Sequence, residues 1–273
     1  MSAKVLFVFE GERTEDIIVR SLEKHILSKG NLVVKCAFGA EVYQLYQEVK
    51  GDEDLDTFEL IKNRNANKET LKDYNRSDFA EIYLFFDYDA HARLASSSID
   101  LFGHQTKEGD EKLKDLLRFF DNETEKGKLY ISYPMVEALK HIKDYETFHE
   151  LVVRCKGINC SYRADCDEKV ECADSPHYKA IVDTENIPQL RNIGDYTEEI
   201  WKNLITTHLS KMNCIVNGRY EFPQKIECQK DIFEKQLEKH ISKKCPVVSV
   251  LSAFPVFVHD YYGNEETRKL ILL

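Results

Sequence analysis

The chain has 273 residues, of which 42% are hydrophobic and 32% are charged. This composition is typical of a globular protein and excludes a long disordered or low-complexity tract. The net charge of −10 would repel a nucleic acid if it were spread evenly, so binding to a phosphate backbone would require a local basic patch. The apolar runs are short and interrupted by charges, which excludes a membrane span, and we expect a cytoplasmic protein.

Strand and helix signals alternate through the first half of the chain. Lys4–Phe9 is a nearly unbroken apolar run rich in β-branched and aromatic residues, which predicts a buried strand. Thr14 is expected to be the N-cap of a helix that runs to about Gly30, and Pro134 is expected to open another helix. The same signals predict further strands over residues 32–37, 81–86 and 129–132, and helices over residues 41–50, 55–62 and 111–120.

This alternation predicts an α/β fold, in which a mainly parallel sheet carries helices on both faces. In such sheets, ligands bind at the carboxyl ends of the strands. Glu10, Asp87 and Ser132 each lie at the end of a predicted strand. We therefore expect these three side chains at one edge of the sheet.

The pattern changes beyond about residue 150. We divide the chain into an α/β domain, residues 1–150, and a mostly helical accessory region, residues 151–273. Within the accessory region, helices are expected over residues 198–212 and 231–241.

The last apolar segment, residues 247–262, predicts either a helix broken at Pro255 or a pair of short strands. Its aromatic part, residues 254–262, is more typical of a core or of a dimer interface than of a surface that stacks nucleic-acid bases. The sequence leaves open whether the chain forms a homodimer.

A cysteine-rich insertion, residues 155–177, begins the accessory region. Its four cysteines are separated by 4, 5 and 5 residues and are Cys155, Cys160, Cys166 and Cys172. Four thiolates suit a structural Zn²⁺ ion, but the usual Cys-x-x-Cys spacing is absent. We weigh zinc evenly against unligated cysteines, and an iron–sulfur cluster below both.

Three carboxylates carry the strongest indication of chemistry. Asp87 and Asp89 are two positions apart at the end of a strand, so both can reach one ion, and Glu10 ends a neighbouring strand. Mg²⁺ prefers such hard oxygen ligands. An Asp-x-Asp after a strand is, by itself, more often turn and cap chemistry, but the combination with Glu10 in this order favours a metal site.

Three motifs in order resemble those of Toprim domains. Residues 8–15, Val-Phe-Glu-Gly-Glu-Arg-Thr-Glu, are similar to the first motif in overcoming-lysogenization-defect (OLD) nucleases and RloB-like proteins. Residues 84–89 resemble the Asp-x-Asp motif, and residues 131–137 resemble a third motif in which a serine and a glutamate flank a proline. The resemblance covers roughly the first half of the chain and implies a Toprim-like fold for residues 1–150.

The resemblance implies a site for Mg²⁺ or Mn²⁺. The expected ligands are Glu10, Glu15, Asp87, Asp89, Ser132 and Glu137. Glu10 would also act as a general acid or base, and Glu15, Ser132 and Glu137 would complete a second metal position. Those nuclease branches use a lysine beyond the third motif to stabilise developing charge on phosphate, for which Lys179 is the first candidate and Lys140 the second.

By this resemblance we expect a Toprim-fold, metal-dependent endonuclease that cleaves phosphodiester bonds in DNA or RNA, transfer RNA included. The chain has no P-loop motif, whereas OLD nucleases carry an ABC-class ATPase. An ATPase would therefore act in trans, as in anti-phage systems such as PARIS, which pair a Toprim nuclease with a separate ATPase. A non-catalytic adaptor that binds such an ATPase or a nucleic acid is the alternative, and a phosphatase or nucleotidyltransferase is a third.

Overall fold

A five-stranded sheet forms the centre of the protein. The computed structural model describes residues 4–11, 13–27, 32–49, 54–88, 107–154, 178–243 and 247–272. The strand order is β2-β1-β3-β5-β4, with bounds β1 (Lys4–Phe9), β2 (Leu32–Ala37), β3 (Phe79–Asp87), β4 (Asp121–Asn122) and β5 (Gly127–Ser132). Strands β2, β1, β3 and β5 pair in parallel, and β4 is antiparallel to β5. The predicted α/β class and all four predicted strands are confirmed, and β4 is an addition too short for a sequence pattern to indicate.

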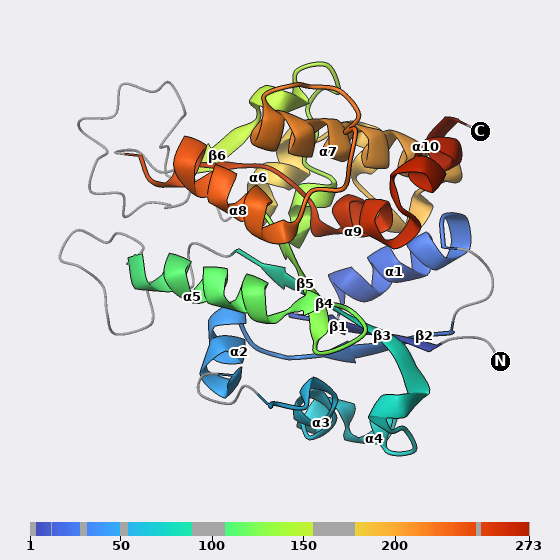
Figure 1. Ribbon diagram of the computed structural model, residues 1–273. Helices are drawn as coiled ribbons and strands as arrows, with labels where there is room; N and C mark the ends of the chain where they lie inside the picture. Colours follow the sequence, from blue (N-terminus) through green and yellow to red (C-terminus); the bar gives the residue numbers. More distant parts are fainter. Residues whose placement is uncertain are drawn as a thin grey trace.

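Helices cover both faces of the sheet, as predicted. The helices of the first half are α1 (Thr14–His25), α2 (Val42–Val49), α3 (Thr57–Lys62), α4 (Lys68–Leu71) and α5 (Lys107–Phe119). Short 3₁₀ turns accompany them: η1 (Asn65–Asn67), η2 (Arg76–Asp78), η4 (Val136–Leu139) and η5 (Phe148–Glu150). Figure 1 shows α1 on one side of the sheet together with α9 (Ala253–Tyr262), and α3 and α4 on the other.

Two expected helix starts differ from the structure. Thr14 is the first residue of α1 rather than its cap, and Arg13 occupies the cap position without a side-chain hydrogen bond. Glu15 instead contacts the segment before the helix, because its Oε1 accepts the backbone N–H of Gly11 at 3.3 Å. The helix expected from Pro134 is only the 3₁₀ turn η4.

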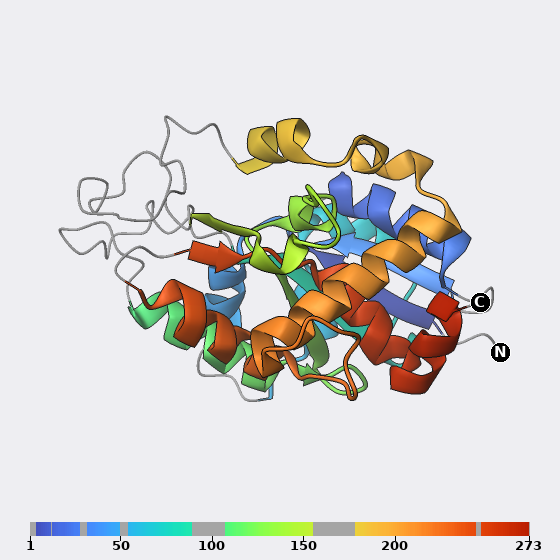
Figure 2. The same ribbon diagram turned by 90° about the horizontal axis from the view of Figure 1, so that it is seen from above.

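The rest of the chain is mostly helical, as predicted. Its helices are α6 (Tyr178–Glu185), α7 (Glu198–Asn217), α8 (Gln229–Gln236), α9 and α10 (Asn264–Leu272), with turns η6 (Pro188–Leu190), η7 (Ile193–Asp195) and the π-helical η8 (Leu237–Ile241). Two short strands, β6 (Val152–Arg154) and β7 (Val247–Ser249), pair antiparallel. Helix α7 packs against α9 and crosses the molecule in Figure 2.

The segment over residues 247–262 matches neither expectation in full, because a single short strand, β7, is followed by the unbroken helix α9. Pro255 does not break α9, since it lies in the first turn, where a missing backbone N–H leaves no helical hydrogen bond unmade. None of the described helices is both long and apolar enough to cross a membrane.

Aromatic side chains join α9 to the sheet. The ring of Phe254 stacks on Phe85 with centroids 4.8 Å apart. The ring of Phe257 lies 5.2 Å from Phe7 and 4.8 Å from Tyr83. The expectation that this aromatic segment is core is thus confirmed, and one continuous hydrophobic core contains residues of both halves of the chain.

A buried lysine ties α7 to the loop before β6. The side chain of Lys211 has no exposed surface, and its Nζ donates to the carbonyl oxygens of Phe148 at 2.8 Å and Leu151 at 2.5 Å. The same nitrogen lies 4.2 Å from the centroid of the Phe148 ring. Burial holds the pKa of Lys211 well below its usual range.

Candidate metal-binding site

A pocket of about 560 Å³ lies at the carboxyl edge of the sheet. Segments that follow three parallel strands line it: residues 10–11 and 13–15 after β1, residues 39–41 after β2, and residues 135–137 after β5. Asp87, the last residue of β3, lies among them. This placement follows from topology, because the carboxyl ends of parallel strands meet at one edge.

Glu10 faces Asp87 across neighbouring strands. The backbone N–H of Glu10 donates to the carbonyl oxygen of Phe85 at 3.0 Å, which continues the pairing of β1 with β3 by one residue. The backbone N–H of Asp87 in turn donates to Oε2 of Glu10 at 3.0 Å. The two carboxylates predicted from distant parts of the chain are thus brought together.

The Asp87 carboxyl is under electrostatic stress. Only 9% of the residue is exposed, and burial is the main cause that raises its pKa well above the usual value. The negative charges of Glu10, Glu15 and Glu137 raise this pKa further, whereas a hydrogen bond from the Val136 backbone lowers it. A nearby cation would relieve this stress.

Glu15 lies on the first turn of α1 and points back into the pocket. It is 7% exposed, and burial raises its pKa, opposed by hydrogen bonds from backbone N–H groups, one of them that of Gly11. Gly11 leaves the space that Glu15 needs, since a Cβ atom at Gly11 would lie 3.2 Å from Oε1 of Glu15. The negative charge of Glu137 also raises the pKa of Glu15, and the positive charge of Lys179 lowers it.

Glu137 lies on η4, lines the same pocket and is 4% exposed. Its Oε1 lies 3.5 Å from Nζ of Lys179 on α6. Its Oε2 is buried and accepts no hydrogen bond from any described part of the chain. An orphaned buried carboxylate oxygen is costly and is an oxygen that a cation could satisfy.

The structure places the other predicted residues elsewhere. Ser132 is the strand neighbour of Asp87, but its Oγ accepts the backbone N–H of Ala253 at 3.3 Å, and it does not line the pocket. Lys140 pairs with Asp183 at 2.7 Å and does not line it either. The predicted ligand Asp89 and the four cysteines Cys155, Cys160, Cys166 and Cys172 lie outside the described residues.

Sequence reasoning missed two residues near the carboxylates. Arg13 is exposed and lines the pocket. It lies inside the first motif, between Glu10 and Thr14, and this position could have indicated that it belongs to the site. Tyr178 is buried, and its pKa is raised by burial and by the charges of Glu137 and Asp87. It directly precedes Lys179, but no pattern in the sequence indicates what it contacts.

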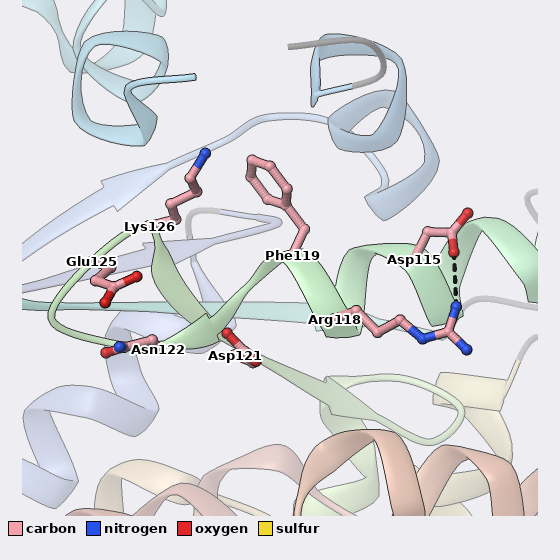
Figure 3. A pocket seen from close by; sticks show the side chains of 7 residues that line it. All are labelled: Asp115, Arg118, Phe119, Asp121, Asn122, Glu125 and Lys126. Atoms are coloured by element: carbon pink, nitrogen blue, oxygen red, sulfur yellow. Dashed lines mark hydrogen bonds and ion pairs between the residues drawn. The ribbon is translucent and has the colours of Figure 1, made fainter. Parts of the chain in front are cut away.

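A second pocket of about 430 Å³ lies at the amino-terminal edge of the sheet, beside β4 (Figure 3). Arg118 pairs with Asp115 there at 3.1 Å, and Nζ of Lys126 lies 4.4 Å from the centroid of the Phe119 ring. With three acidic and two basic side chains, this pocket is less negative than the first, which five acidic side chains and Arg13 line.

The oxygen donors of the first pocket fit a hard divalent cation such as Mg²⁺ or Mn²⁺, and the orphaned Oε2 of Glu137 supports that fit. Within the described ranges, however, no three His, Cys, Asp or Glu side chains are drawn together tightly enough to hold an ion by themselves. Comparisons with protein-family models, with curated proteins and with solved structures find no match for this chain.

Proposed function

We propose that this protein is a Toprim-like endonuclease that depends on Mg²⁺ or Mn²⁺. One observation carries the proposal: the carboxylates Glu10, Glu15, Asp87 and Glu137 line a single pocket at the carboxyl edge of a parallel sheet. Burial and mutual repulsion raise the pKa of Asp87 there. A binding module has little use for so much unbalanced buried charge, whereas a site for divalent cations needs it.

The residues of the pocket have distinct roles in this proposal. Asp87 and Glu137 would hold the ion, with Asp89 and Glu15 as further ligands. A bound ion would supply positive charge to a phosphate oxygen and lower the pKa of a bound water. Glu10 would take up or return a proton, because it lines the same pocket and its carboxylate accepts the backbone N–H of Asp87.

In this proposal, two positively charged side chains bind the substrate. Lys179, whose side chain is 62% exposed, lies beside Glu137 and can contact a phosphate oxygen where negative charge develops. Arg13 lines the same pocket from the start of α1 and can bind a neighbouring phosphate with its guanidinium group. These two residues would supply local positive charge for a substrate on a chain of net charge −10.

The biological setting follows from the resemblance of the three motifs alone. We propose that the nuclease is the effector of an anti-phage or abortive-infection system, with an ABC-type ATPase as a separate partner. DNA and RNA, transfer RNA included, are both substrates that fit this chemistry. A non-catalytic adaptor remains the competing proposal, and it differs in a measurable way.

The test is cleavage by the purified protein. Wild-type protein should nick plasmid DNA or cleave transfer RNA in Mn²⁺ or Mg²⁺ and not in EDTA. Glu10→Gln and Asp87→Asn keep the size of each side chain, and each should lower the cleavage rate by about 10²-fold or more. Asp115→Asn is the matched control because it removes an exposed carboxylate from the second pocket, and it should keep the wild-type rate.

Cleavage that persists in both Glu10→Gln and Asp87→Asn would rule out the metal-site mechanism. An inactive wild-type protein that binds nucleic acid or an ATPase equally well with and without these substitutions would favour the adaptor.

A further inference from the structure

The contacts of the Lys179 side chain itself are too weak to fix its position near the pocket. Its side chain is 62% exposed, and its one ion pair in the described structure, with Glu137, spans 3.5 Å. A partly exposed pair of this kind contributes little to holding a helix in place, because water competes for both charges and a long side chain must be ordered. The position of Lys179 is therefore set by the other contacts of α6.

One buried histidine contacts both ends of α6. His141, which has no exposed surface, lies in the segment that follows η4. Its Nδ1 is 2.9 Å from the hydroxyl of Tyr178, the first residue of α6, and its Nε2 is 3.4 Å from Oε2 of Glu185, the last residue. The rings of His141 and Tyr178 also meet edge to face, with centroids 5.3 Å apart.

The hydrogen bonds define a consistent protonation state. Glu185 can only accept, so we assign the proton of the neutral imidazole to Nε2, which leaves Nδ1 to accept from the Tyr178 hydroxyl. Burial lowers the pKa of His141 to about 4, against the opposing effect of Glu185, so the ring is neutral at pH 7. Oε2 of Glu185 is further paired with Lys143 at 2.6 Å.

The same segment carries Glu137. Hydrogen bonds within it connect Glu137 to His141: the N–H of Lys140 donates to the carbonyl oxygen of Glu137, and that of His141 to Ala138. The imidazole is thus a short bridge between the turn that presents Glu137 and the helix that presents Lys179.

We propose that His141 is a positioning residue that clamps α6 through Tyr178 and Glu185 and so keeps Lys179 opposite Glu137. The proposal rests on the nuclease function proposed above and extends it: the rate of cleavage depends on a residue that neither lines the pocket nor contacts the substrate. Displacing a catalytic group by about 1 Å can lower a rate by about 10²-fold.

The test is a double-mutant cycle in the full-length chain. Tyr178→Phe removes only the hydroxyl that bonds His141 and should lower kcat by about 10-fold, with little change in KM. His141→Ala should lower kcat further. Tyr196→Phe is the matched control because it removes a buried hydroxyl bonded to the carbonyl oxygen of Leu190 at 2.8 Å, and it should leave kcat unchanged.

Repeating the substitution in Lys179→Ala protein tests whether the clamp acts through Lys179. In Lys179→Ala protein, Tyr178→Phe should have no further effect on kcat, because the clamp acts through that lysine. A full 10-fold loss in that background would overturn the proposal, since the two substitutions would then act independently. Unchanged kcat in both Tyr178→Phe and His141→Ala would overturn it as well.

A second measurement does not depend on cleavage. Hydrogen exchange should become faster at the amides of α6 (Tyr178–Glu185) in His141→Ala, and remain as in the wild type in Tyr196→Phe. Unaltered exchange would remove the clamp even if the protein is a nuclease. Faster exchange in a wild-type-folded protein that cleaves nothing would overturn the proposed function, and with it the catalytic consequence of the clamp, while leaving the structural contact intact.

Discussion

Replacing Asp87 with asparagine should make the metal-free protein more stable. The carboxyl of Asp87 is buried and faces the negative charges of Glu10 and Glu15, with a weaker effect from Glu137. An amide has nearly the same shape, carries no charge and keeps an oxygen that can accept the hydrogen bond from Val136. The substitution therefore removes repulsion and leaves packing in place.

Coulomb's law gives the order of magnitude of this effect. Two like charges separated by about 8 Å repel by about 2 kcal/mol at an effective dielectric constant near 20. The hydrogen bond from Val136, worth about 1 kcal/mol, is retained in the variant. At a pH above the raised pKa of Asp87, where its carboxylate is charged, we expect the free energy of unfolding to rise by about 2 kcal/mol, which raises Tm by about 4–8 °C in a chain of this size.

The dependence on pH has a definite sign. The pKa of Asp87 is raised in the fold, so between about pH 4, the unfolded value, and that higher pKa the folded protein holds a proton that the unfolded chain has released. The stability of the metal-free protein should therefore fall as pH rises through this window. This part of the slope should be absent in Asp87→Asn.

Added metal should reverse the order of the two proteins. Mg²⁺ or Mn²⁺ at about 100 times its Kd stabilises a protein by about 2.7 kcal/mol, so wild-type Tm should rise by about 5–11 °C. Asp87→Asn should show little of this gain. Thermal unfolding from pH 4 to 8, in EDTA and in Mn²⁺, measures all of these effects, with Asp115→Asn as the control.

A loss of stability in metal-free Asp87→Asn across this pH range would refute the electrostatic reasoning. An equal metal-induced rise of Tm in the variant and the wild type would show that Asp87 does not bind the ion.

Two further substitutions test the packing. Phe257→Ala should lower the free energy of unfolding by about 3–5 kcal/mol, measured by denaturant titration, because the ring is fully buried against the sheet; a loss below about 1 kcal/mol would mean that α9 is not part of the core. Lys211→Ala should cost about 2–4 kcal/mol in the same assay, because it removes a fully buried side chain, leaves a cavity and deletes the two hydrogen bonds from Nζ to Phe148 and Leu151; an unchanged unfolding midpoint would contradict this role.

The strands and the edge that carries the site could be predicted from the sequence. A buried parallel strand is a continuous apolar run, and Lys4–Phe9 can be recognised as one from its own residues, without knowledge of the strands beside it. Once the strands are placed, parallel topology brings their carboxyl ends together, so Glu10 and Asp87 could be paired although they are far apart in the chain. Their proximity is therefore a consequence of local patterns and one topological rule.

What could not be predicted depends on tertiary contacts. Ser132 has the strand position of a ligand. Its hydroxyl oxygen, however, accepts a hydrogen bond from the backbone N–H of Ala253, at the N-terminal end of α9. Pro255 resembles a helix breaker until the helix start is known. No sequence pattern indicates the contact of His141 with Tyr178, because the two residues lie 37 positions apart and belong to no shared motif.

The packing of α9 on the sheet also bears on how the protein folds. The rings of Phe7 and Phe257 are in contact although they lie about 250 positions apart in the sequence, and contacts between such distant residues form slowly. The strands that end at Glu10 and Asp87 therefore gain part of their cover only when a distant helix docks, so the geometry of this edge depends on both halves of the chain folding as one unit.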